Sequence, residues 1–196
     1  WGPEEIGFVS GGSGIVGMSN LSRDYLTYII QNLAELDAMA DIIIVDTGAG
    51  ISDAVLEFLV ASGEILLVTT PEPTSITDAY TLLKALSRHN RFSSESTKIK
   101  VLSNRVESLE EGRTLFSKLN AVVSRYLKLP IEYLGAVPQD AELSRSVMQQ
   151  TPVSINSPKA ISTKAYEEIA GILMNKEINQ TVHKRGMAAF FSHIVA

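Results

Sequence analysis

The sequence predicts an α/β fold with three layers, in which a mostly parallel sheet lies between two layers of helices. Runs rich in β-branched residues alternate with segments of helical periodicity along most of the 196 residues. The connections between these runs are long enough to hold a crossover helix, which is how neighbouring parallel strands are joined. The positions just after the predicted strands are polar or turn-forming, as expected at the ligand-binding edge of such a sheet.

Five segments have the composition of strands. The first is short and runs into the flexible turn "GGSGIVG". The second, "DIIIVD", is a continuous β-branched run, which is typical of a strand covered on both faces. The third, "EILLVTT", is stopped by the "PEP" that follows it. The predicted strands span residues 4–10, 41–46, 64–70, 98–106 and 131–138.

Helices are predicted between these strands, because apolar residues recur there every three to four positions. Ser52 or Asp53 is a suitable N-cap for the helix that follows "DIIIVD". The predicted helices span residues 20–39, 52–62, 74–90, 108–128, 140–150 and 158–176.

The composition limits the class of protein. A chain of this length has enough residues for one domain with a sizeable core. The net charge of −5 argues against a dominant role in nucleic-acid binding, which depends on clustered cations. The absence of cysteine excludes disulfides and thiolate metal sites and favours a reducing cytoplasm. No apolar run reaches the roughly 18–20 residues of a membrane span.

The most specific functional candidates are Asp46, Gly48 and Gly50, here called the switch residues. Asp46 follows an apolar run, where a carboxylate carries a desolvation cost unless it meets a cation or hydrogen-bond donors. Mg²⁺, usually reached through a water molecule, is the standard partner of such an acid in phosphate-transfer sites. The two glycines allow the backbone to approach a γ-phosphate and to change conformation. The alternative is an acid that ends a strand and caps the next helix.

Four more candidates lie at the ends of two other predicted strands: Asn104, Arg105, Pro138 and Asp140. They are here called the base-edge residues. The Asn104 amide offers both a donor and an acceptor, as recognition of a base edge requires. Pro138 and Asp140 place a turn and an acid at the neighbouring strand end. In the ordinary alternative, Asn104 is a turn residue and Asp140 is the N-cap of the following helix.

No phosphate-binding loop is found in this chain. Such a loop needs the pattern G-x-x-x-x-G-K-[ST], and none of the nine lysines follows a glycine. The glycine-rich residues 9–17 are therefore interpreted as a connection between a strand and a helix. His89, His183 and His193 show no metal-ligand spacing and are expected at the surface.

The C-terminal residues 183–196 differ from the rest of the chain. Five apolar side chains fall on one face of a predicted helix that follows the basic "HKR": Met187, Phe190, Phe191, Ile194 and Val195. This pattern favours a helix that lies on an anionic membrane surface. A C-terminal helix docked on the body and a frayed chain end are the alternatives.

Taken together, these segments resemble the MinD/ParA-type deviant Walker ATPases, which are SIMIBI-class P-loop NTPases. "DIIIVDTGAGIS" resembles their Walker B strand and switch II, and "LLVTTPEPTSITDAYTLLK" resembles the next strand, proline loop and helix. "VLSNRV" and "GAVPQDAELSRSVMQQTPV" resemble their base-binding segments. "VDTGAGIS" with "TTPEPTSITDAY" is most similar to the flagellar-number regulators, the FlhG (FleN, YlxH) branch. The resemblance covers residues 2–174.

The resemblance implies an ATPase that uses ATP and Mg²⁺. Asp46 would hold the magnesium ion through water, and the two switch glycines would sense the γ-phosphate. Asn104 would bind adenine with Arg105 beside it, while Pro138 and Asp140 would close the far side of the base.

The resemblance also implies partners and a location. ATP would join two protomers face to face, and this homodimer would place a C-terminal amphipathic helix on the membrane until hydrolysis releases it. The protein would be cytoplasmic and peripherally attached to the inner face of the cell membrane. Flagellar assembly proteins, namely an SRP-type GTPase and C-ring components, would be its partners, and nucleic acid would not.

Part of the family pattern is missing from this chain. The family's first strand, its K-G-G-x-G-K-[ST] loop and its switch I aspartate lie upstream of the segments found here, and the chain begins at Trp1. Residues 1–180 are therefore expected to be the C-terminal part of the ATPase domain, with an incomplete sheet, and residues 181–196 its membrane tail. Alone, this part should not hydrolyse ATP. A partition-type ParA ATPase that binds DNA and a non-catalytic α/β scaffold module are the alternatives.

Overall fold

The computed structural model describes residue 2 and residues 5–9 and 39–178. The glycine-rich connection, nearly all of the predicted first helix and the C-terminal tail lie outside the described residues. The membrane-binding residues predicted in the tail, among them Met187, Phe190, Phe191 and Ile194, and the predicted boundary at residue 180 therefore stay predictions.

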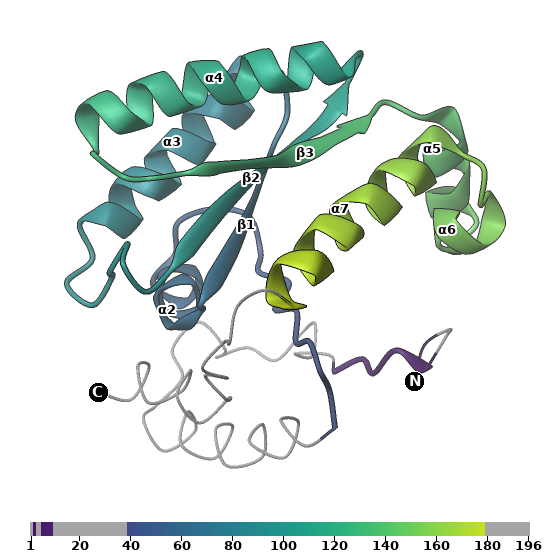
Figure 1. Cartoon of the computed structure of the whole chain (residues 1–196), viewed down its shortest axis with the longest axis horizontal. Coiled ribbons are helices and arrows are strands. Elements are labelled where there is room, and N and C mark those ends of the chain that lie inside the picture. Colours follow the sequence, from purple (N-terminus) through teal and green to yellow (C-terminus); the bar gives the residue numbers. More distant parts are fainter. Residues whose placement is uncertain (1, 3–4, 10–38, 179–196) are drawn as a thin grey trace.

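The described part contains a sheet of three parallel strands in the order β1-β2-β3 (Figure 1). The strands are β1 (Glu64–Thr69), β2 (Lys98–Val106) and β3 (Glu132–Pro138). Each lies within one residue of its predicted bounds, because a short apolar run bounded by turn residues is a strong strand signal.

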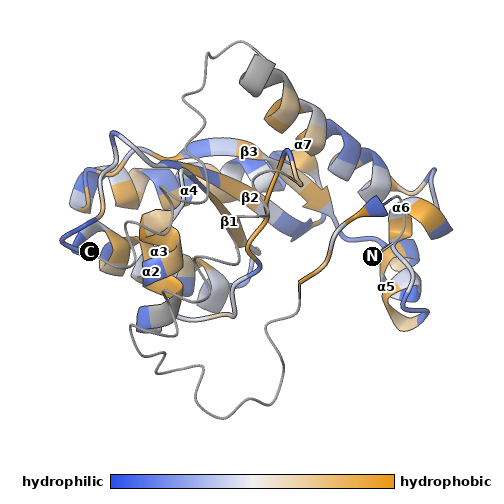
Figure 2. Cartoon of the chain, turned by 90° about the horizontal axis from the view of Figure 1, so that it is seen from below, coloured by the Kyte–Doolittle hydropathy of each residue, from blue (hydrophilic) through white to orange (hydrophobic). Residues whose placement is uncertain are grey.

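Helices cover both faces of this sheet. The helices α3 and α4 pack on one face together with α2, and α7 packs against β3 on the other face, as Figures 1 and 2 show. The short helices α5 and α6 connect β3 to α7 and project from the end of the sheet. This arrangement confirms the predicted three-layer α/β fold. The helices are α2 (Asp53–Ala61), α3 (Pro73–Ser87), α4 (Leu109–Tyr126), α5 (Ala141–Met148), α6 (Val153–Asn156) and α7 (Ile161–Ile178).

The larger hydrophobic core lies between the sheet and the α3–α4 layer. Its most deeply buried members are no more than 2 % exposed: Leu83, Leu86, Ile99, Val101, Leu119 and Val123. A smaller core joins α7 to β3 through Ile169, Leu134 and Val137. In β1, Ile65 and Leu67 point into the larger core, whereas Leu66 and Val68 on the other face are 42 % and 52 % exposed.

The prediction of a strand at residues 41–46 is wrong for this structure. The segment has no regular secondary structure, and Ile42, Ile44 and Val45 are 50 %, 80 % and 41 % exposed. A strand forms only against a neighbour that satisfies its backbone hydrogen bonds. The described strand nearest in sequence, β1, pairs only with β2. The β-branched composition of residues 41–46 was therefore not sufficient to make them a strand.

The predicted strand at residues 4–10 is also wrong for residues 5–9, which the structure describes. Residues 5–9 form no strand, and Ile6, Phe8 and Val9 are 65 %, 79 % and 69 % exposed. Here too, no described strand lies alongside to accept the backbone hydrogen bonds.

The close approach of α4 to the sheet depends on a glycine. A Cβ atom placed on Gly112 would lie 2.7 Å from the Cβ of Ala136 and 3.1 Å from the hydroxyl of Tyr133. The Ser103 hydroxyl of β2 donates a hydrogen bond of 2.9 Å to the Gly112 carbonyl oxygen. Any side chain at position 112 would therefore push α4 away from β2 and β3.

Replacing Gly112 with alanine tests this contact, with Gly171→Ala as a matched control. Gly112→Ala should lower the free energy of unfolding by about 1–3 kcal/mol, because the added methyl group overpacks a tight contact. Gly171 lies in α7 with nothing within 4 Å of an added Cβ. Gly171→Ala should therefore raise the free energy of unfolding by about 0.5–1 kcal/mol. Urea unfolding of both variants measures the difference, and equal effects would contradict the proposed packing.

Candidate functional site at the carboxyl edge of the sheet

The three parallel strands end at the same edge of the sheet, here called the carboxyl edge. β1 ends at Thr69, β2 at Val106 and β3 at Pro138. Ligands of open α/β sheets bind outside this edge. All four base-edge residues lie at the ends of β2 and β3 or directly after them, so the structure brings this predicted set together.

Arg105 has a backbone conformation that is unusual for a strand. Its φ is +56°, in the left-handed region, and the pairing of β2 with β3 shifts register between Asn104 and Val106. A non-glycine residue in this region costs about 1–3 kcal/mol and persists only where its surroundings hold it. Bulges of this kind redirect a side chain.

The Arg105 side chain extends sideways along the carboxyl edge. Its Nε donates a hydrogen bond of 3.1 Å to Oε1 of Gln139, which follows β3. Its Nη1 lies 4.0 Å from Oε1 of Glu72, in the loop after β1. Glu72, Arg105 and Gln139, here called the edge bridge, therefore connect the loops that follow all three strands.

The carboxylate of Glu72 is held in its charged form. Hydrogen bonds from the Thr70 side chain and from the backbone at Glu72, together with the nearby Arg105 guanidinium, lower the pKa of Glu72 from its ordinary value. Glu72 and Arg105 are both exposed, so water screens their attraction and it contributes little to stability. The edge bridge therefore contributes by positioning the Arg105 and Gln139 side chains at the carboxyl edge, and it adds little to the free energy of unfolding.

Asn104 presents its amide in a defined orientation. The side chain is partly buried, and its Oδ1 accepts a hydrogen bond of 3.0 Å from the backbone N–H of Arg105. Among the described residues, no hydrogen bond is made by its Nδ2. The amide therefore uses its acceptor within the protein and offers its donor at the carboxyl edge.

Asp140 is buried and links two helices. Its Oδ1 accepts a hydrogen bond of 2.9 Å from the N–H of Glu142 in α5. Its Oδ2 accepts bonds of 3.0 and 2.7 Å from the N–H and the hydroxyl of Ser162 in α7. This confirms the alternative in which Asp140 is the N-cap of α5, and its contact with a base stays a prediction.

These donors change the acidity of Asp140. The Ser162 hydroxyl, then its N–H, and more weakly the N–H groups of Glu142 and Leu143 hold the pKa of Asp140 below its ordinary value. The carboxylate therefore stays charged at neutral pH, and its hydrogen bonds hold the N-termini of α5 and α7 together.

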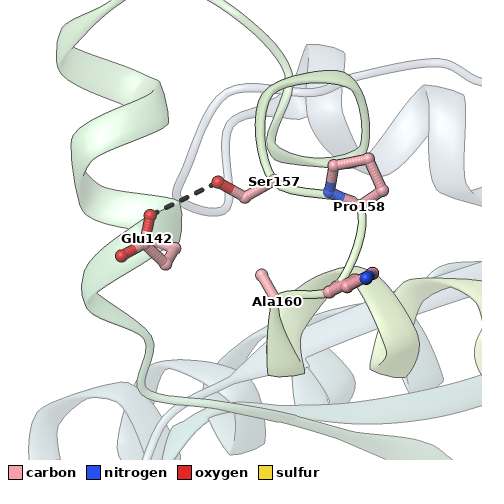
Figure 3. A pocket seen from close by; sticks show the side chains of 5 residues that line it. Glu142, Ser157, Pro158 and Ala160 are labelled. Carbon is pink, nitrogen blue, oxygen red and sulfur yellow. Dashed lines mark hydrogen bonds between the residues drawn. The ribbon is translucent and has the colours of Figure 1, made fainter.

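A depression of about 470 Å³ lies between the start of α5 and the connection from α6 to α7 (Figure 3). The Ser157 hydroxyl donates a hydrogen bond of 3.3 Å across it to Oε2 of Glu142. Five residues line the depression: Glu142, Ser157, Pro158, Lys159 and Ala160. Glu142 belongs to the segment "GAVPQDAELSRSVMQQTPV" but was not singled out in it, and the other four residues follow α6 in a connection that carries no motif.

The switch residues belong to none of the three strands. Asp46, Gly48 and Gly50 are exposed and belong to a segment without regular secondary structure. Gly50 has a φ of +108°, which side-chain-bearing residues rarely adopt, and a Cβ on Gly48 would meet nothing within 4 Å. No hydrogen bond or ion pair in the described part of the chain joins Asp46 to a base-edge residue.

Residues 39–178 and the short described segments before them contain neither a cluster of metal ligands nor a membrane-spanning helix. No group of three or more His, Cys, Asp or Glu side chains is placed to hold a metal ion there. No helix of that part is long and apolar enough to cross a membrane.

Asp140→Asn tests the link between α5 and α7. The amide would place a donor against the N–H of either Glu142 or Ser162, so the free energy of unfolding at pH 7 should fall by about 1.5–3 kcal/mol. Because the folded-state pKa of Asp140 is lowered, its stabilising effect is complete above the ordinary aspartate pKa of about 4. The effect is lost as the pH falls through the folded-state pKa, so the two proteins should converge in acid.

Urea unfolding at pH 7 and at a series of lower pH values measures this convergence. Asp78→Asn, at an exposed position of α3, is the control and should differ little from the wild type at each pH. A constant deficit of Asp140→Asn at every pH would contradict the role of the carboxylate charge.

The chain is similar to flagellar and cell-division proteins. It is 37% identical over 169 residues to the antiactivator FleN of Pseudomonas aeruginosa, covering 86% of this chain and 59% of FleN. It is 32% identical over 158 residues to the flagellum site-determining protein YlxH of Helicobacter pylori, covering 79% of this chain and 52% of YlxH. The chain thus spans little more than half the length of these relatives.

The fold is similar to that of solved MinD structures. The MinD cell division protein of Aquifex aeolicus superposes with a TM-score of 0.60 at 21% identity, covering 79% of this chain and 61% of that one. No protein-family model matches the chain. On its sequence similarity and its fold, the chain belongs to the MinD/ParA-type family of P-loop ATPases, close to the FlhG (FleN, YlxH) branch of flagellar-number regulators.

Proposed function

We propose that this chain is the C-terminal part of an ATP-binding and ATP-hydrolysing switch that associates with the membrane and regulates flagellar number or placement. The observation that carries the proposal is the set of polar groups at the carboxyl edge, in a chain similar to FleN and YlxH over most of its length. The similarity covers a part of those proteins, so the activity belongs to the gene product that contains this chain.

Asn104 is the proposed adenine-binding residue. Its free amide donor lies at the strand end where ligands of this fold class bind, and Arg105 lies beside it. Pro138 and the turn at Asp140 are proposed to close the far side of the base. The depression lined by Glu142 and Ser157 lies next to this turn and offers space for part of the nucleoside.

Asp46 is the proposed magnesium residue. It is an exposed carboxylate, and no cluster of ligands that could hold an ion by itself occurs among the described residues. This suits Mg²⁺, which protein sites usually hold through one or two carboxylates, water molecules and the phosphates of the substrate. Gly48 and Gly50 are proposed to form the backbone switch that senses the γ-phosphate, and the phosphate-cradling loop would come from outside this sequence.

Asp46→Ala in the gene product that contains this chain should abolish ATP turnover, because the carboxylate orients the magnesium ion that neutralises the phosphates. Asp41→Ala is the matched control, since Asp41 is an exposed acid at the other end of the same apolar run. Phosphate release measures both variants. Wild-type turnover by Asp46→Ala would contradict the assignment.

The apolar residues of the C-terminal tail are proposed to bind the inner face of the cell membrane. Deleting residues 186–196 should release the protein from anionic liposomes, because it removes the apolar side chains that would insert between lipids. Co-sedimentation with anionic vesicles measures binding, and neutral vesicles show how much depends on lipid charge. Undiminished binding of the truncated protein would disprove the membrane role of the tail.

The proposed partners follow from the same assignment. ATP is proposed to join two copies of the protein face to face, and the dimer is proposed to contact flagellar assembly proteins, namely an SRP-type GTPase and C-ring components. The net charge of −5 supports a function without nucleic acid.

A further inference from the structure

We propose that the outer edge of β3, the side that does not pair with β2, is a docking site for a short extended segment of a partner protein, which adds to the sheet as a further strand. This inference goes beyond the proposed function, because none of the switch or base-edge residues lines the site. Three observations carry it: unpaired backbone groups on the strand edge, a groove at that edge, and opposite charges on the two walls of the groove.

The outer edge of β3 has backbone groups that no described strand pairs with. In the strand order β1-β2-β3, β3 has a neighbour on one side only (Figure 1). The Gln139 N–H donates a hydrogen bond of 2.8 Å to the Val106 carbonyl oxygen. Alternate residues of a strand point their backbone groups to the same side, so those of Val137 also face β2. The N–H and C=O of Ala136 and the C=O of Pro138 therefore face outward, as on an unprotected edge.

A groove of about 250 Å³ lies at this edge, between α4 and α7. The helix α7 comes close to β3 because Gly135 has no side chain, since an added Cβ would lie 3.2 Å from Cγ1 of Ile169. The helix α4 comes close for the same reason at Gly112. Leu109 on the α4 wall is 57 % exposed, and Ile172 on the α7 wall is partly buried. The groove therefore offers apolar surface on both walls.

Each wall of the groove also carries a charge. Arg113 of α4 places its guanidinium carbon 5.7 Å from the centroid of the Tyr133 ring. Burial raises the pKa of Tyr133, the Arg113 guanidinium lowers it and the Glu168 carboxylate of α7 raises it, so both charges act on one phenol. Within the described residues, the Tyr133 hydroxyl makes no hydrogen bond, and Arg113 and Glu168 make no ion pair. These three groups are therefore available to a ligand.

A short extended peptide fits this edge better than a second copy of the chain. Peptides that add to a sheet edge gain affinity from main-chain hydrogen bonds and specificity from alternate side chains. The open edge is limited at one end by the register shift that skips Leu134 and at the other by Pro138, which lacks an N–H. Bulges and edge prolines hinder the pairing of two whole sheets. The open edge between them therefore suits a segment of a few residues.

The geometry of the sheet specifies the side chains of this segment. Successive residues of an added strand point to opposite faces of the sheet, so one set faces α4 and the other faces α7. An acidic residue in the first set would meet Arg113 and the Tyr133 hydroxyl, and a basic residue in the second would meet Glu168. Apolar residues of the two sets would cover Leu109 and Ile172. The charges mainly select the partner, because exposed ion pairs contribute little to affinity.

The test is a selection from a phage-displayed library of random peptides of about nine residues, enough for one strand, on the gene product that contains this chain. Selected peptides should carry an acidic and a basic residue an odd number of positions apart, as the alternation of faces requires. Arg113→Glu or Glu168→Lys should weaken their binding about fivefold, because each turns an attraction into a repulsion. Peptides in which the matching charge is reversed should recover that loss.

Two charge reversals outside the groove are the matched controls. Lys118→Glu and Glu167→Lys change exposed side chains of α4 and α7 that do not line it, so both should leave binding unchanged. Synthetic copies of a selected peptide, methylated at alternate backbone amides, test the strand addition itself. Methylation of the set of amides that faces β3 should abolish binding, and methylation of the other set should be tolerated. Urea unfolding of each variant separates a change in binding from a loss of stability.

The outcomes decide for or against the docking site. Peptides that show the charge spacing, the rescue and the dependence on one set of amides support it. A library that yields no such peptide, or peptides that bind Arg113→Glu and Glu168→Lys as well as the wild type, overturn it. Light scattering without ATP that shows a dimer of the wild type and a monomer of Arg113→Glu would assign the edge to a second copy and also overturn it. Nucleotide binding is measured separately, so each of these results leaves the proposed function intact.

Discussion

The parallel pairing of three strands is the constraint on which the rest of this structure depends. Parallel strands cannot be joined by tight turns, so α3 and α4 must cross over between β1, β2 and β3. Those helices bury the apolar side of the sheet and form the larger core. The same pairing places three strand ends, and the loops that follow them, along one edge. Without it, Glu72, Arg105 and Gln139 would not meet.

A few short contacts then fix the layers around this sheet. Gly112 allows α4 to lie against Ala136, and Ser103 closes that contact with a hydrogen bond. On the other face, the Asp140 carboxylate holds the starts of α5 and α7 with three hydrogen bonds. The strand ends that carry Asn104 and Pro138 therefore belong to packed elements, which position side chains more precisely than loops do.

Much of the fold was predictable, and the failures have one cause. β1, β2 and β3 and their helices follow from continuous apolar runs, helical periodicity and, for α2, the capping residue Ser52. The run at residues 41–46 has an equally strong composition but no described neighbour to pair with. Composition indicates how well the side chains of a segment suit a strand. A strand forms only when its backbone hydrogen bonds are paired with those of a neighbouring strand.

The sequence by itself determined the order of the elements, the chemical groups at the strand ends and the resemblance to the MinD/ParA-type ATPases. Only the tertiary structure decided what those groups do. It turned Arg105 into the left-handed region, used Asp140 to join two helices and brought Glu72 and Gln139 to Arg105 from distant positions. The physical reason is that a side chain's hydrogen-bond partners depend on distance in space. Local sequence patterns carry no information on that distance for residues more than 30 positions apart.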